Sequence, residues 1–285
     1  MTLISKIKAS VLYKLYVKQW VIGLLYGDIR EMIRTKSFNF KIKWLSVSSY
    51  YRFHGDPFLH KNSNGNLDIL FEDFSLDENY GNISLMTLDQ NLKITDQKIL
   101  LDTKSHLSYP FIFRENNKIY VFPESARSGV LSCYEFDPEI KALSYLKEVI
   151  NLPLLDSTIL KHDNKYWLFG TLNDKENGYI MNVYFSDNLL GPYMPHTANP
   201  VKKGLNGTRG AGEFIAVDGI WYRPSQNCEN AYGESITINK LLKLDDTEVI
   251  EEPYMLIMID DENLDKHGIH TIHTINSMDG ILPMT

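Results

Sequence analysis

The stretch DSTILKHDNKYWLF at residues 156–169 contains the pattern that decides the fold. Asp156 opens a short apolar run, the pair Asp163-Asn164 follows, and a second run ends in aromatic side chains. β-Branched and aromatic residues favour strands, and an Asp-Asn pair tolerates the positive φ angles of a tight hairpin turn. The stretch therefore predicts a β-hairpin.

The same plan occurs three more times along the chain. The other copies open at Asp56, Tyr109 and Gly212, and their turns carry Asn64-Gly65, Asn116-Asn117 and Asp218-Gly219. The four starts recur at a period of roughly 50 residues, the size of a four-stranded propeller blade. A fifth start lies at residues 268–271, but the chain that remains after it is too short for a blade.

These repeats predict an all-β fold, a five-bladed β-propeller closed by strands from both termini. The closing strands would come from residues 20–26 and 44–51, joined to the C-terminal remnant, because a closed ring leaves no open sheet edge. Residues 1–34 are expected to form an N-terminal amphipathic helix and closing segment, and residues 35–285 the propeller.

The N-terminal segment carries the sequence features of a basic amphipathic helix. Four lysines, at positions 6, 8, 14 and 18, interrupt its apolar residues, so it matches neither a secretory signal nor a membrane span. Such a helix can lie on an anionic membrane; alternatively, the segment can pack on the domain as a surface helix or as a helix followed by a strand. We expect a cytoplasmic protein that is peripheral to the inner membrane face through residues 1–34.

Charge and cysteine content exclude other classes of protein. The net charge of −7 argues against a nucleic-acid partner, because phosphate binding needs a basic face. Two cysteines, Cys133 and Cys228, form neither a disulfide framework nor a zinc site. His270 and His273 would point to opposite faces of a strand, so we expect no metal and no cofactor.

The starts of the repeats should meet at the centre of the propeller, where the innermost strands lie. This places Asp56, Tyr109, Asp156, residues 209–213 and His270 around one cavity. Carboxyl groups gathered in this way push one another's pKa apart, which separates an acid from a base. An Asp before Pro or Ser is also a common turn residue, and that alternative stays open.

The order of three acidic residues resembles glycoside hydrolase family 43, whose members are inverting five-bladed propellers. The resemblance implies that Asp56 is the general base, that Asp156 tunes the pKa of its neighbours, and that Glu213 is the general acid.

A second resemblance covers the chain from about residue 20 to its end. The sequence is similar to the N-terminal propeller domain of plant glucosamine inositolphosphorylceramide transferases and its bacterial stand-alone relatives. The matching strings are HGDPFL at 54–59, FEDF at 71–74, HLSYPF at 106–111, PES at 123–125, GPYMPH at 191–196, NPV at 199–201, RGAG at 209–212, RPSQ at 223–226, YG at 232–233 and GIHT at 268–271. In this family Glu124 is the rival of Glu213 for the role of acid.

The second resemblance implies a glycosyltransferase-type enzyme in the synthesis of a surface polysaccharide or glycolipid, acting on a carbohydrate or a nucleotide- or lipid-linked sugar. Asp56 would activate the acceptor hydroxyl, with Asp156 and either Glu124 or Glu213 as acid or electrostatic partners. The expected substrate-binding residues are His106, Tyr109, Arg209, Arg223, Gln226, Tyr232 and His270. Arg209 and Arg223 could hold a phosphate or carboxylate, or form buried salt bridges between blades.

Two other functions stay open at this point. An inverting glycoside hydrolase would use the same carboxyl groups to activate water. A non-catalytic sugar-binding propeller would use its aromatic residues for stacking and its carboxylates as hydrogen-bond partners of sugar hydroxyls.

Overall fold

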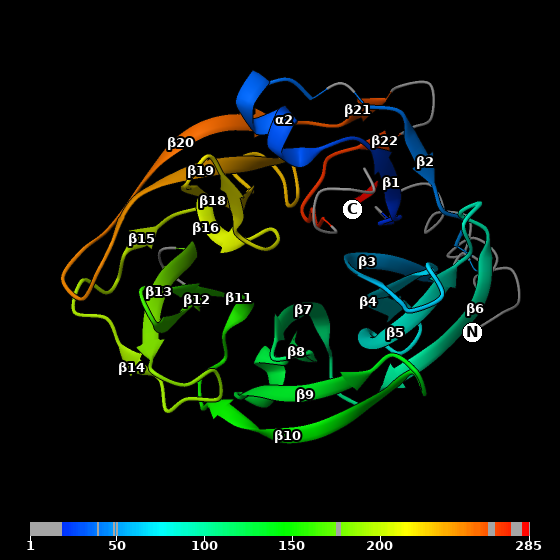
Figure 1. Ribbon diagram of the computed structural model, residues 1–285, viewed down its shortest axis with the longest axis horizontal. Helices are drawn as coiled ribbons and strands as arrows, with labels where there is room; N and C mark the ends of the chain where they lie inside the picture. The colour runs from blue at the N-terminus through cyan, green and yellow to red at the C-terminus, as the bar shows by residue number, and fades with distance from the viewer. Residues whose placement is uncertain are drawn as a thin grey trace, which may run out of the picture.

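The computed structural model of the chain describes residues 19–38, 40–47, 49, 51–174, 178–261, 266–274 and 281–284. Four antiparallel β-sheets stand around a common axis, which confirms the all-β propeller architecture (Figure 1). We call these sheets blades one to four in chain order, and the first strand of each lies nearest the axis.

The blades contain the following strands. Blade one has β3 (Arg52–Lys61), β4 (Leu67–Ser75), β5 (Tyr80–Leu88) and β6 (Ile94–Leu101). Blade two has β7 (Ser108–Glu115), β8 (Lys118–Glu124), β9 (Leu131–Asp137) and β10 (Ala142–Ile150), with a 3₁₀ turn at Ala126–Ser128. Blade three has β11 (Leu155–His162), β12 (Lys165–Asp174), β13 (Gly178–Ser186), β14 (Met194–Pro195) and β15 (Lys202–Lys203). Blade four has β16 (Asn206–Gly210), β17 (Ile215–Val217), β18 (Ile220–Asn227), β19 (Ser235–Leu244) and β20 (Val249–Ile257).

The predicted hairpin is the β11–β12 pair of blade three. His162 pairs with Lys165 across the turn, and Leu160 pairs with Trp167. Asp163 and Asn164 have φ angles of 48° and 60°, as a two-residue hairpin turn with both central residues left-handed requires. The local sequence rule therefore holds in three dimensions.

The prediction of five blades was wrong, because the described chain forms four. The space between blades four and one contains a three-stranded sheet of β2 (Ile42–Trp44), β1 (Gly23–Tyr26) and β23 (Ile281–Met284) (Figure 1). β1 pairs on one side with β2 and on the other with β23, so both chain ends do meet here. Residues 268–271 add no regular strand to this sheet, so it does not reach the size of a blade.

The expected N-terminal helix is also corrected where it can be followed. Residues 1–18 lie outside the described residues. Residues 23–26 form strand β1, and the short helix α2 (Ile29–Thr35) begins only after Asp28, whose side chain accepts a hydrogen bond from the Arg30 N–H. The described part of the segment is therefore a strand followed by a short helix. Leu24 and Leu25 of the strand are fully buried in the closing sheet.

The core lies between neighbouring sheets and around the axis. One cluster joins blades one, two and three around Phe58, Phe111 and Leu168, and another packs Ile33 of α2 against blade four. Cys133 and Cys228 are buried and unbonded to each other. Among the described helices, none is long and apolar enough to span a bilayer.

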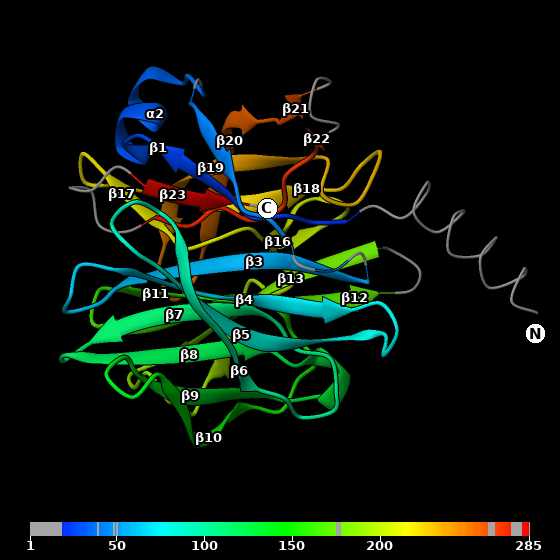
Figure 2. The same ribbon diagram turned by 90° about the vertical axis from the view of Figure 1, so that its right-hand side faces the viewer.

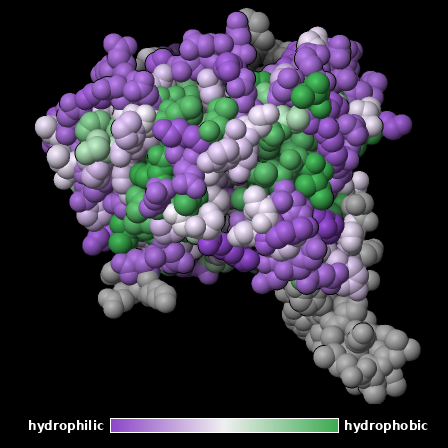
Figure 3. All heavy atoms as spheres, turned by 90° about the horizontal axis from the view of Figure 1, so that it is seen from below, coloured by the Kyte–Doolittle hydropathy of each residue, from purple (hydrophilic) through white to green (hydrophobic). Residues whose placement is uncertain are grey.

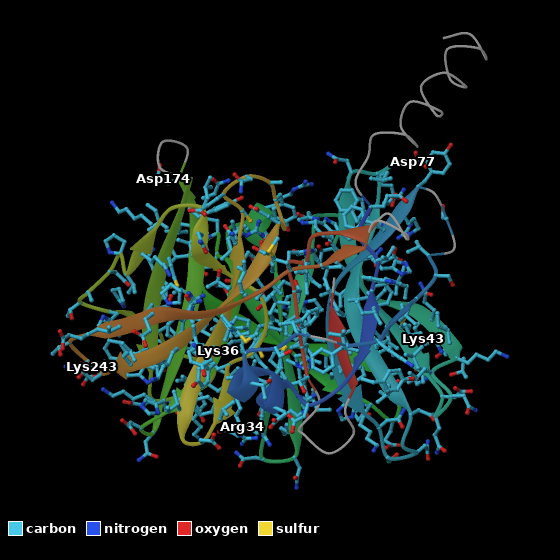
Figure 4. All side chains as sticks on the ribbon, turned by 90° about the horizontal axis from the view of Figure 1, so that it is seen from above. Arg34, Lys36, Lys43, Asp77, Asp174 and Lys243 are labelled. Atoms are coloured by element: carbon cyan, nitrogen blue, oxygen red, sulfur yellow. The ribbon has the colours of Figure 1, made fainter. Side chains whose placement is uncertain are left out.

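The propeller has two distinct faces. The β4–β5 and β12–β13 turns, marked by Asp77 and Asp174, lie at one face, and α2, marked by Arg34 and Lys36, lies at the opposite one (Figure 4). Figure 2 shows the same separation from the side. On the outer wall in Figure 3, apolar and hydrophilic residues alternate in small areas. We call the face with the β4–β5 and β12–β13 turns the turn face, and the opposite one the α2 face.

Candidate active site

In three blades, the residue that opens the sequence repeat points towards the axis through the same backbone feature. Asp56, Tyr109 and Asp156 have φ angles of 49°, 40° and 44°. Each lies at a register shift between the first and second strands of its blade. A bulge with a left-handed residue re-aims one side chain out of the normal alternation of a strand, and such conformations are costly for residues other than glycine. The repeat start is therefore a bulge and not a turn.

Asp56 is 4% exposed and is surrounded by donors. His270 Nε2 lies 3.2 Å from Oδ1, the Thr271 hydroxyl donates to the same oxygen, and the Tyr109 N–H donates to Oδ2 at 3.3 Å. Burial by itself raises the pKa of this carboxyl, but the attraction of His270 and the hydrogen bonds outweigh it. The net effect lowers the pKa, so Asp56 is ionised at neutral pH.

Asp156 is paired with the guanidinium of Arg209. Arg209 Nε donates to Asp156 Oδ2 at 2.5 Å, and Gln226 Nε2 donates to the same oxygen at 3.1 Å. Burial raises the pKa of Asp156, and the charge of Arg209 offsets this only in part. Arg209 Nε is therefore already bound to a side chain of the protein.

Glu72 and Glu124 complete a group of four carboxyls with Asp56 and Asp156, which we call the carboxylate cluster. Glu124 Oε2 accepts the Asp156 N–H at 3.1 Å. Burial and the neighbouring carboxylates raise the pKa of Glu124 to about 8 and that of Glu72 well above its ordinary value. Glu124 is therefore protonated at neutral pH, next to the ionised Asp56, and the pKa of Glu72 is shifted in the same direction.

Tyr109 is buried next to the carboxylate cluster, at the axis of the propeller. Its hydroxyl lies 3.0 Å from Thr158 Oγ1 and accepts the Gly212 N–H at 2.7 Å, and its side chain is fully buried. Burial raises the pKa of the phenol, which stays neutral. Tyr109 therefore ties three blades together at the axis rather than facing solvent.

His106 lies at the edge of the cluster in its neutral form. Burial, and then the charge of Arg127, lower its pKa to about 4. Its Nδ1 accepts the Gly81 N–H at 3.0 Å and lies 3.8 Å from Glu72 Oε1, so the proton of the neutral ring is on Nε2. A Cβ on Gly81 would come within 2.7 Å of Glu72 Oε1, so this glycine leaves room for the Glu72 carboxyl.

An aromatic rim lies above the cluster at the turn face. The guanidinium carbon of Arg209 is 5.2 Å from the ring centroids of both Tyr179 and Tyr232. Trp20 lies 4.2 Å from the His270 ring and 5.9 Å from Tyr232, centroid to centroid. Tyr232 is 43% exposed, so the rim offers aromatic surface to a ligand approaching the cluster.

Glu213 is not brought to the carboxylate cluster. Gly212, which precedes it, donates to Tyr109 and packs against Ile272, so the chain carries Glu213 past the axis to the α2 face. There its Oε1 lies 3.6 Å from His273 Nε2, and burial raises its pKa to about 7. A catalytic role for Glu213 stays a prediction, without geometric support from the cluster.

Arg223 also lies outside the cluster. Its Nε and Nη2 donate to the two carboxylate oxygens of Glu251 at 2.8 and 2.6 Å, and Lys202 Nζ lies 3.1 Å from Glu251. This is the buried salt-bridge alternative, with Lys202 linking blade three to blade four. Substrate binding by Arg223 stays a prediction that this pairing does not favour.

Glu72 lies in the FEDF motif at 71–74, but the sequence pattern alone indicates no role for it. Glu72 pairs with Gly55 in blade one, and Glu124 pairs with Ser108 in blade two, so both stand opposite the residue before a bulge. This equivalence within the repeat was the signal that could have identified Glu72. Thr271 and Trp20 were missed because their places depend on contacts with distant segments.

The cluster has the parts needed for acid–base chemistry on a polar substrate. It combines the ionised Asp56, the protonated Glu124, a further carboxyl of raised pKa at Glu72 and a bound guanidinium within one buried site. Groups with pKa values pushed apart in this way can take one proton and supply another at the same pH. Within the described part of the chain, no group of His, Cys, Asp and Glu side chains is arranged to hold a metal.

Comparison with known proteins identifies similar sequences. The family model described as "Glucosamine inositolphosphorylceramide transferase 1, N-terminal" matches residues 43–273. Glucosamine inositolphosphorylceramide transferase 1 of Arabidopsis thaliana is 30% identical over an alignment of 263 residues, which covers 83% of this chain and 34% of that protein. The protein of that name from Oryza sativa subsp. japonica is 32% identical over 210 residues, 72% of this chain and 28% of the other. The chain thus spans about a third of these relatives.

Comparison of structures finds glycoside hydrolases with the same fold. A family 117 glycoside hydrolase of Zobellia galactanivorans has a TM-score of 0.55 at 14% identity, covering 72% of this chain and 69% of the other. A thermostable family-43 glycoside hydrolase has a TM-score of 0.56 at 15% identity, covering 76% and 83%. At such low identity the likeness shows the fold alone.

Proposed function

Because the chain belongs to the family of the N-terminal domain of glucosamine inositolphosphorylceramide transferase 1, we propose that it is a carbohydrate-active enzyme of glycosyltransferase type in glycolipid or surface-polysaccharide synthesis. The observation that carries the proposal is the carboxylate cluster, in which Asp56 is ionised while Glu124 is protonated. The relatives are about three times as long as this chain, and the match covers 34% and 28% of their length.

In the proposed reaction Asp56 is the base and Glu124 the acid. The acceptor hydroxyl gives its proton to Asp56 as its oxygen bonds to the anomeric carbon of the donor sugar. The bond from that carbon to the leaving oxygen breaks, and Glu124 supplies a proton to the leaving group. Asp156 acts through Glu124, because its carboxylate raises the pKa of that acid.

The charge of the site favours neutral or amino sugars. Four carboxyls face one guanidinium, whose Nε is already bound to Asp156, and one imidazole. A free phosphate would meet the ionised Asp56 unfavourably, whereas a neutral or amino sugar would not. Glucosamine, which the relatives' name contains, carries an ammonium group of suitable charge. We therefore propose that the cluster holds the sugar ring and that any phosphate of the donor lies towards the rim.

The test is turnover of a panel of nucleotide- and lipid-linked sugars with and without acceptor, for the wild type and three variants. Asp56→Asn and Glu124→Gln should each reduce turnover by roughly 10²- to 10⁴-fold, the usual contribution of acid–base catalysis. Glu213→Gln, which changes a matched carboxyl outside the cluster, should stay near wild type. A larger loss at Glu213 than at Glu124 would overturn the assignment of the acid.

An inverting glycoside hydrolase is a second candidate, favoured by the pairing of an ionised and a protonated carboxyl in a fold shared with family-43 hydrolases. In that case Asp56 would activate water instead of an acceptor hydroxyl. Release of sugar from aryl glycosides without an acceptor, with inverted anomeric configuration by NMR, would support it. Sugar binding without turnover in either assay would instead support a non-catalytic propeller.

A further inference from the structure

The segment at residues 269–274 gives the axis of the propeller two polar ends. His270 and Thr271 contact Asp56 in the carboxylate cluster. His273 contacts Leu59 and Glu213, and Thr274 lies beside them towards the α2 face. One short segment therefore connects the candidate active site with a separate polar group at the opposite face.

His273 is a buried side chain with one nitrogen unsatisfied. Its Nδ1 accepts the Leu59 N–H at 3.2 Å, so the neutral ring carries its proton on Nε2. Burial and the charge of Arg114 hold its pKa well below the ordinary value. Among the described residues Nε2 has no hydrogen-bond partner, because Glu213 Oε1 at 3.6 Å is too far for a good bond. A buried donor left without a partner is costly, so His273 and Glu213 together form an incompletely satisfied polar pair.

Glu213 connects this histidine with a cavity of about 240 Å³. The cavity is lined by Ile29, Arg30, Glu213, Phe214, Trp221 and Thr274, together with residues 215 and 216. None of the four residues of the carboxylate cluster lines it. It lies beside α2, at the face opposite Asp77 and Asp174 (Figure 4).

The lining selects an uncharged ligand with several hydroxyls. The wall carries charge of both signs: Arg30, with Arg114 behind it, opposes a cation, and the Glu213 carboxyl, which is partly ionised at a pKa of about 7, opposes an anion. The Trp221 ring offers an apolar face, while Glu213 and Thr274 offer hydrogen bonds. Sites for drug-sized ligands occupy about 300–1,000 Å³, so this smaller cavity suits a single ring.

The geometry points to a second binding site at the α2 face, which takes one neutral monosaccharide or cyclic polyol between Glu213 and Trp221. A ring hydroxyl in the cavity would bind the Glu213 carboxyl, whose Oε1 lies 3.6 Å from His273 Nε2 behind the cavity wall. This site is distinct from the carboxylate cluster and does not depend on the reaction proposed there.

The experiment is fluorine NMR of the whole chain labelled with 5-fluorotryptophan. The chain has four tryptophans, and Trp→Phe variants assign the Trp20 and Trp221 signals. Trp20 reports on the rim of the cluster, and Trp221 reports on the α2 cavity. The probes are D-glucose, D-galactose, D-mannose and myo-inositol, each up to about 10 mM, ten times a millimolar dissociation constant.

We expect at least one probe to move the Trp221 signal in the wild type. Ala216→Phe, at an exposed residue of the cavity wall, should abolish this movement, and the matched exposed change Ala198→Phe should keep it. Glu213→Ala should weaken the apparent affinity at least about tenfold, which corresponds to 1.4 kcal/mol. The proposal is overturned if no probe moves Trp221, if only Trp20 moves, or if Ala216→Phe leaves the Trp221 response unchanged. None of these outcomes depends on turnover at the cluster.

Discussion

At the scale of single residues, the carboxylate cluster shows how one environment produces opposite charge states. Asp56 and Glu124 are both buried, but Asp56 accepts from Thr271 and the Tyr109 N–H beside His270. Glu124 instead lies next to Asp156, whose carboxylate raises its pKa. Donors favour the ionised form and a neighbouring carboxylate disfavours it, which explains the difference.

The raised pKa of Glu124 predicts a measurable effect on stability. The pKa is about 8 in the folded chain and 4.5 ordinarily, so the folded state binds more protons between these values and the free energy of unfolding falls as pH rises through that window. Glu124→Gln removes this loss. We expect the variant to gain roughly 2–4 kcal/mol over wild type between pH 4 and pH 8, since each pKa unit corresponds to about 1.4 kcal/mol.

Glu251→Gln is the matched control with the opposite sign. Burial raises the pKa of Glu251, but Arg223 and Lys202 outweigh it and lower the pKa. Its ion pair therefore stabilises the fold above pH 4.5 and loses that effect as pH falls through the lowered pKa. Urea unfolding at several pH values should show Glu251→Gln destabilised at pH 7 and recovering at low pH. Parallel curves for the two variants would contradict the assigned charge states.

At the scale of elements, the site depends on where inner strands break their regular pairing. The bulges at Asp56, Tyr109 and Asp156 turn these residues to the axis. In blade four, Gly212 has a φ of 142° and lies where the pairing with β18 passes from Gly210 to Ile215. A Cβ at Gly212 would lie 1.9 Å from the Ile272 carbonyl oxygen. The segment at 269–274 can therefore pass the inner strand of blade four only at a glycine.

Gly212→Ala should destabilise the protein strongly. We expect a loss of about 2–4 kcal/mol beyond that of Gly129→Ala, because both positions have positive φ but Gly129 has no atom within 4 Å of an added Cβ. Midpoints of urea unfolding give the difference. Equal midpoints for the two variants would show that the segment beside Ile272 moves away at little cost.

We propose that the N-terminal segment, residues 1–34, binds weakly to anionic membranes. Its lysines and apolar residues should give weak binding to anionic vesicles, worth about 1 kcal/mol for each lysine near the surface. Co-sedimentation with phosphatidylserine vesicles should fall when Lys6, Lys8, Lys14 and Lys18 are changed to Glu. The matched change of four exposed lysines of the propeller should have less effect; an equal effect would indicate general charge attraction.

At the scale of the whole molecule, the ring closes through a sheet that both chain ends share. β23 is the last strand of that sheet and pairs with β1 at four positions. Deleting residues 281–285 removes this strand and exposes the edge of β1. We expect a loss of about 2 kcal/mol, or roughly 4–8 °C in Tm, in thermal unfolding. An unchanged Tm would show that the four blades hold the ring without the closing sheet.

The sequence by itself determined the parts of this protein that local chemistry controls. The hairpins at 156–169 and its equivalents follow from alternating apolar residues and turn pairs, because both act within a few residues of the chain. The shared placement of Asp56 and Asp156 near the axis follows from their equal position in the repeat. The family resemblance followed from motifs that surround these same residues.

Only the tertiary structure decided how many blades form and which polar groups meet. The fifth blade is absent because residues 268–271 run beside the axis and contact Asp56, and so do not pair in a sheet. Glu72 joins the cluster, Glu213 leaves it, and Arg223 pairs with Glu251 through contacts between segments far apart in the chain. Such contacts depend on bulges and on the packing of whole blades, which no pattern within a single repeat specifies.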